Sequence, residues 1–105
     1  MNVKHKILNA ILSALMALIA VSANAYTGQK LEKNAKFKMV EARAIALKAH
    51  PGKIKDEELE KEKGGSGLRY SFDIINAGKK GTQEVGVDAM TGVILENKLE
   101  GKNPD

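Results

Sequence analysis

The sequence predicts an α+β domain in which one N-terminal helix packs on a sheet of three or four antiparallel strands. Three observations predict it: a run of apolar residues at helical spacing, a highly charged stretch closed by glycines, and strictly alternating segments after it. Short loops join these segments, so the helix and the sheet form two layers around a single core.

Residues 1–25 have the features of an export signal. Lys4 and Lys6 make a basic start, the 15-residue run Ile7–Val21 is mostly apolar, and small residues precede a cleavage point after Ala25. A bilayer-spanning helix needs about 20 apolar residues, more than this run supplies. We therefore expect cleavage after Ala25 and a periplasmic or secreted protein. No cysteine follows, which excludes attachment through a lipidated cysteine.

Cleavage there leaves 80 of the 105 residues, and without the two leader lysines the 17 basic side chains become 15 against 13 acidic ones. This net charge of +2, with interleaved signs and no tryptophan, predicts no nucleic-acid partner. Without disulfides, stability must come from one small core. We expect a flexible leader over residues 26–36, the domain over 37–98 and a flexible tail over 99–105.

The helix is expected between Phe37 and His50. Pro51 disfavours helical geometry at His50, and Gly52 follows, so the helix should end there. Lys38 is a poor N-cap, which leaves the start of the helix undefined. Alanine favours helix intrinsically. The predicted buried stripe is Met39, Ala42, Ile45, Ala46 and Ala49.

The charged stretch Ile54–Lys63 is interpreted as a strand at the edge of the sheet, where lysine and glutamate discourage unwanted pairing. Its two apolar residues, Ile54 and Leu59, are an odd number of positions apart, so a β-bulge should lie between them. Alternating strands then follow over residues 68–75, 82–89 and 93–98.

Two glycine-containing loops invite a functional interpretation, but both are predicted to be turns. Gly64–Gly67 lacks the strand-to-helix context and the lysine of a phosphate-binding loop. In Asp88–Gly92, Asp88 and Thr91 can bond to the local backbone, and Gly92 can adopt the positive φ of a tight turn.

Few side chains after residue 25 could act as the nucleophile or the base of a catalytic triad: there is no cysteine, one histidine and two serines. A Ser-His-Asp triad would need His50 with Ser66 or Ser71, and neither serine lies in a nucleophile elbow. As a metal ligand, His50 has no second histidine or cysteine to join it. Asp73 and Asp88 are expected on the solvated face of the sheet. The sequence thus predicts no catalytic residue, no cofactor, no metal site and no enzyme.

Taken together, several segments resemble a PepSY domain, the module named after peptidase propeptides. They are "EARAIALKAHPGKI" (Glu41–Ile54), a charged strand containing Leu59, "GLRYSFDI" (Gly67–Ile74) and "EVGVDAMTGVIL" (Glu84–Leu95), in the order and spacing of the family. The resemblance covers roughly residues 37–98.

The resemblance implies a non-catalytic module with no catalytic residues to carry over. In secreted thermolysin-like metalloproteases such domains lie in the propeptide that restrains the protease, and elsewhere they are repeated or fused to membrane segments. One departure is Lys38, where the family tends to have a capping serine or threonine.

From these observations we expect an exported interaction module whose partner is an exported or membrane-associated protein. One candidate for that partner is a peptidase, which the module would restrain. Two alternatives remain open: an accessory or sensory subunit of an envelope membrane complex, and a small-ligand or metal carrier using His50. The edge strand could pair with an extended segment of the partner. Its candidate residues are Lys53, Lys55, Glu57, Leu59, Lys61 and Lys63.

Overall fold

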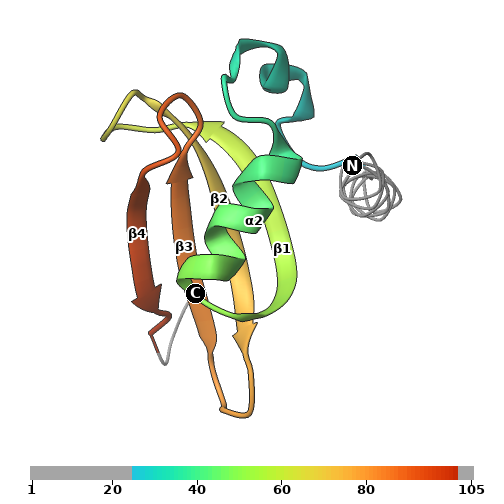
Figure 1. Ribbon diagram of the computed structural model, residues 1–105, viewed down its shortest axis with the longest axis vertical. Helices are drawn as coiled ribbons and strands as arrows, with labels where there is room; N and C mark the ends of the chain where they lie inside the picture. The colour runs from blue at the N-terminus through green and yellow to red at the C-terminus, as the bar shows by residue number, and fades with distance from the viewer. Residues whose placement is uncertain (1–24, 102–105) are drawn as a thin grey trace, which may run out of the picture.

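Within residues 25–101, a short 3-10 helix, one α-helix and four antiparallel strands follow one another (Figure 1). The computed structural model describes residues 25–101, so residues 1–24 of the expected export signal (1–25) and residues 102–105 of the expected tail lie outside it. Among the described residues, no helix is long and apolar enough to cross a bilayer. The elements are η1 (Gln29–Asn34), α2 (Met39–Ala49), β1 (Gly52–Lys61), β2 (Leu68–Asn76), β3 (Thr82–Asp88) and β4 (Ile94–Leu99).

The four strands form one sheet in the order β1-β2-β3-β4, and α2 crosses one face of it (Figure 1). The predicted α+β class is therefore confirmed. The predicted bulge is present as well, because the register shifts between Ile54 and Asp56. The shift lets Ile54 lie opposite Ile74 and Leu59 opposite Tyr70, both of which are buried core residues.

Helix α2 ends as predicted, but its start is stabilised by groups that sequence reasoning did not identify. The Lys38 N–H donates to the Glu41 carboxylate (2.8 Å), and the Met39 N–H donates to the Glu32 carboxylate (3.1 Å). These carboxylates satisfy the N–H groups of the N-cap residue and of the first helical residue, which have no partner within the helix. The Lys38 ammonium meanwhile donates to the Ala35 carbonyl (2.8 Å).

Residues 26–36, expected to be a flexible leader, form defined structure instead. Thr27 makes a parallel bridge with Glu58, and its carbonyl accepts the Leu59 N–H (2.9 Å). The Tyr26 hydroxyl donates to Glu32 (2.5 Å), and Tyr26 packs against the core. The segment thereby occupies part of the outer edge of β1. Tyr26 and Leu31 pack against core residues far along the chain, and Thr27 bridges to Glu58; a pattern within this short polar segment does not predict such contacts.

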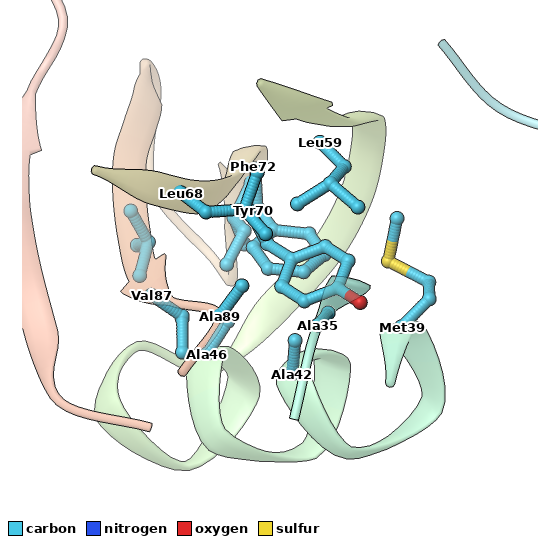
Figure 2. Close-up of a cluster of buried hydrophobic side chains, with 12 residues drawn as sticks. Ala35, Met39, Ala42, Ala46, Leu59, Leu68, Tyr70, Phe72, Val87 and Ala89 are labelled. Atoms are coloured by element: carbon cyan, nitrogen blue, oxygen red, sulfur yellow. The ribbon is translucent and has the colours of Figure 1, made fainter. Parts of the chain in front are cut away.

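The core lies between α2 and the sheet (Figure 2). Ala42 and Ala46 are fully buried, and their small side chains let the helix lie close to the strands, whereas Ala49 of the predicted stripe is exposed. The buried Tyr70 hydroxyl donates to the Phe37 carbonyl (2.7 Å), so its polar atom is satisfied. The strands contribute Leu59, Leu68, Tyr70, Phe72, Ile74, Val85 and Val87.

Candidate functional site

The face of the sheet opposite α2 is lined mostly by carboxylates. Side chains alternate between the two faces of a strand, so the residues between the core positions project onto this second face. We call it the open face, because α2 covers only the other one (Figure 1). It contains a hollow of about 340 Å³ lined by Asp56, Glu58, Glu60, Glu62, Ser71, Asp73, Glu84 and Glu96.

The strand register brings acids from different strands together. Asp73 on β2 lies opposite Asp56 on β1 and opposite Glu84 on β3. Like charges directly opposite each other in a sheet are destabilising. An arrangement that places three such residues in one row therefore opposes the stability of the fold.

The ionisation of these acids reflects that arrangement. The pKa of Glu58 is raised, and burial is the largest cause. The charges of its acidic neighbours, first among them Glu60, raise it further. The pKa of Asp73 is raised by burial and then by Glu100, and that of Glu84 by burial and then by Glu96. A raised carboxyl pKa means that the folded protein disfavours the charged form that exists at neutral pH.

The basic residues of the open face lie toward one part of it. Arg69 is 3.7 Å from Glu96 and 3.9 Å from Glu62, and the Lys98 ammonium is 3.1 Å from Glu96. In the part of the chain that the structure describes, no ion pair reaches Glu58, Asp73 or Glu84. Lys98 also lies opposite Glu84 in the sheet, and its charge partly offsets the rise in the Glu84 pKa. The acids that line the hollow still outnumber Arg69 and Lys98, so the open face keeps a net negative charge.

The geometry suits a partner with several spaced cations better than a single metal ion. Over residues 25–101, no three histidine or acidic side chains converge as a metal would require. The carboxylates come instead from all four strands, and they are spread around the hollow. Such a surface attracts and orients a basic surface through complementary potentials.

The edge residues predicted from the sequence occupy several different environments. Lys53, Lys55, Lys61 and Lys63 are exposed, whereas the Leu59 side chain is buried in the core. Glu57 forms an ion pair with Arg43 of α2 (2.6 Å). Because Thr27 already accepts the Leu59 N–H, only the remainder of the β1 edge is open to another strand. Binding at that edge stays a prediction.

Asp88, expected on the solvated face, is instead 1% exposed and organises two turns. Its carboxylate accepts hydrogen bonds from the Ser66 hydroxyl and N–H (both 2.7 Å) and from the Met90 and Thr91 N–H groups (2.8 and 3.1 Å). Burial alone raises the pKa of Asp88, but these hydrogen bonds outweigh burial and lower it. Asp88 therefore has a structural role in joining the 64–67 and 88–92 turns.

The side chains weighed for catalysis have other partners. The His50 ring nitrogen Nε2 contacts the Asn76 side-chain oxygen, which ties the end of α2 to the end of β2. The Ser66 hydroxyl donates to Asp88, and the Ser71 hydroxyl donates to Glu60 (2.8 Å). Neither serine is hydrogen-bonded to His50, so these contacts assemble no nucleophile and base.

Sequence reasoning missed the open face as a unit. The acids of Ile54–Lys63 were predicted only to protect an edge strand from unwanted pairing and were not connected with Asp73, Glu84 and Glu96. A signal was available, because Asp56, Glu58 and Glu60 share one parity along their strand. The register across four strands was needed to show that all these acids share a face.

Comparison with known proteins identifies the family. The family model described as "Peptidase propeptide and YPEB domain" matches residues 39–98, which include α2 and nearly all of the sheet. No curated protein and no solved structure matches the chain. The match spans more than half of the sequence and agrees with the resemblance in its motifs. The chain therefore belongs to the PepSY family.

Proposed function

We propose that this protein is an exported, non-catalytic interaction module that binds a basic surface of another exported protein through its open face. One observation carries the proposal: the open face gathers carboxylates from four strands, and three of them, Glu58, Asp73 and Glu84, have raised pKa values and no ion pair among the described residues. Folding alone does not favour such a surface, whereas a cationic partner would neutralise it.

The membership in a family of peptidase propeptide domains supports a peptidase as the partner. We propose that the module restrains such an enzyme by covering a basic surface beside its substrate-binding region. Restraint needs no catalytic group on this chain, in keeping with the family, whose domains are generally non-catalytic.

The test uses exported peptidase activity from the source organism, measured with fluorogenic casein in the presence of the purified protein. We expect inhibition by the natural sequence and its loss in the variant Glu58→Gln/Asp73→Asn. The matched control is Ala44→Lys/Ala49→Lys, which changes the net charge by the same amount at exposed positions on the helix. It should inhibit as well as the natural protein.

In-cell cross-linking separates binding from restraint. A cross-linked partner that is not a peptidase would refute restraint while supporting the interaction module. Equal cross-linking by the natural protein and by Glu58→Gln/Asp73→Asn would refute the open face as the binding surface. No inhibition and no cross-linked partner at high micromolar protein would refute the whole proposal.

A further inference from the structure

β4 forms the second edge of the sheet, and within residues 25–101 its outer side pairs with no other strand (Figure 1). The other edge differs, because Thr27 bridges to β1. An edge strand with unpaired backbone groups is a template for pairing with another chain, and natural proteins usually protect such edges. β4 carries no proline and one lysine, Lys98, which pairs with Glu96 of the same strand.

The backbone of β4 is suited to accept a further strand. The Glu100 N–H donates to the Thr82 carbonyl (2.8 Å), so the backbone groups at this position point toward β3. These groups alternate in direction along a strand, and those of Asn97 and Leu99 therefore point outward. Two exposed apolar side chains lie at the ends of this edge: Val93, just before β4, is 55% exposed, and Leu99, its last residue, is 61% exposed. Pairing along this edge would remove part of that apolar surface from water.

We propose that β4 is a self-association edge, at which a second copy of the chain pairs antiparallel around a two-fold axis at Asn97. In this register the outward groups of the two Asn97 residues bond to each other. Glu96 then lies opposite Lys98 of the second copy, and Lys98 opposite Glu96 of the second copy. Opposite charges at directly opposed positions stabilise a strand pair.

The charge pattern also selects this register over its neighbours. Moving the axis by one residue would place either Glu96 opposite Glu96 or Lys98 opposite Lys98, and like charges there repel. A heterologous strand would need no such self-complementarity. The two-fold pattern within six residues therefore favours a second copy as the occupant.

The symmetry has a structural consequence. A two-fold axis between antiparallel edge strands stands perpendicular to the sheet, so both helices α2 lie on one side of an eight-stranded sheet. Both open faces then lie together on the other side. This inference goes beyond the proposed function and does not depend on it, because self-association is measured without any partner.

The first experiment is sedimentation of the protein, expressed from the full 105-residue sequence and purified, over a micromolar to millimolar range. We expect a reversible dimer. In Lys98→Glu, each Glu96 would lie opposite a glutamate at position 98 of the second copy. This repulsion across the paired β4 strands should raise the dissociation constant about tenfold or more. Glu96→Lys should do the same with lysine pairs. An equimolar mixture of the two variants should recover dimerisation, because each pair of opposed residues across the two β4 strands is again of opposite charge.

The second experiment measures the register directly, since the chain contains no cysteine. Asn97→Cys at the axis should form a disulfide-linked dimer on mild oxidation. Lys61→Cys, exposed at the other edge of the sheet, is the matched control and should not. Circular dichroism verifies that each variant is folded, and Lys98→Glu suffices if Glu96→Lys does not fold. A monomer at every concentration, or a dimer insensitive to Lys98→Glu and not trapped by Asn97→Cys, would overturn the proposal.

Discussion

Replacing Asp88 by asparagine tests whether the turn between β3 and β4 depends on an ionised carboxylate. Oδ1 accepts the Ser66 hydroxyl and the Met90 and Thr91 N–H groups, while Oδ2 accepts the Ser66 N–H (2.7 Å). Asparagine can retain the first three as neutral bonds. Its amide nitrogen would face the Ser66 N–H, so one charge-assisted hydrogen bond is lost.

The expected cost follows from that count. A hydrogen bond to a charged group contributes about 1.5–3 kcal/mol, so Asp88→Asn should lower the free energy of unfolding by about 2 kcal/mol. For a domain of this size, that corresponds to a fall in Tm of roughly 10 °C. Ser66→Ala is the comparison variant: it removes the hydroxyl that donates to the same carboxylate but leaves the carboxylate ionised, and it should cost a similar amount, about 1.5–3 kcal/mol. Urea denaturation of each protein gives these differences directly.

The pH dependence of this stability difference tests whether the ionised Asp88 carboxylate is its cause. The pKa of Asp88 is lowered in the folded protein, so its stabilisation is present above the unfolded-state pKa of about 3.9 and is lost as pH falls through the lower folded value. The difference between natural protein and Asp88→Asn should therefore shrink from pH 7 toward pH 2. A difference below about 0.5 kcal/mol at pH 7, or one independent of pH, would show that the carboxylate does not stabilise the turn.

Two further predictions concern the N-terminal segment and the open face. Gly28→Ala should release the segment from β1, because a Cβ there would lie 1.8 Å from the Leu59 carbonyl oxygen; hydrogen exchange of the Leu59 amide should accelerate. Gly78→Ala, also at positive φ but with open space around it, should leave that amide protected. The variant Glu58→Gln/Asp73→Asn should gain about 0.5–2 kcal/mol in stability at pH 7. The pKa values of Glu58 and Asp73 are raised in the folded protein, so their charged forms destabilise the natural fold at pH 7. Both groups become protonated as the pH falls toward 4, this destabilisation disappears, and the gain from the substitutions should shrink. A stability loss at pH 7 would contradict the interpretation of the open face.

Local chemistry made much of the fold predictable. Pro51 ends α2 after Ala49, and the odd spacing of Ile54 and Leu59 required the bulge that the register shows. The turn at Asp88–Gly92 also forms as expected, with Gly92 at a φ of 77°. Each of these features depends on a few adjacent residues, whose steric and hydrogen-bonding preferences act in any context.

The sequence by itself therefore determined the class of the domain, the positions of its elements and its family. Tertiary structure alone decided the path of residues 26–36 and the acidic character of the open face. The Thr27–Glu58 bridge joins parts of the chain separated by the whole helix, and the row of Asp56, Asp73 and Glu84 comes from three strands. Periodicity assigns a side chain to one face of its own strand. Which charges become neighbours on that face depends on strand order and register, which the packing of the whole core selects.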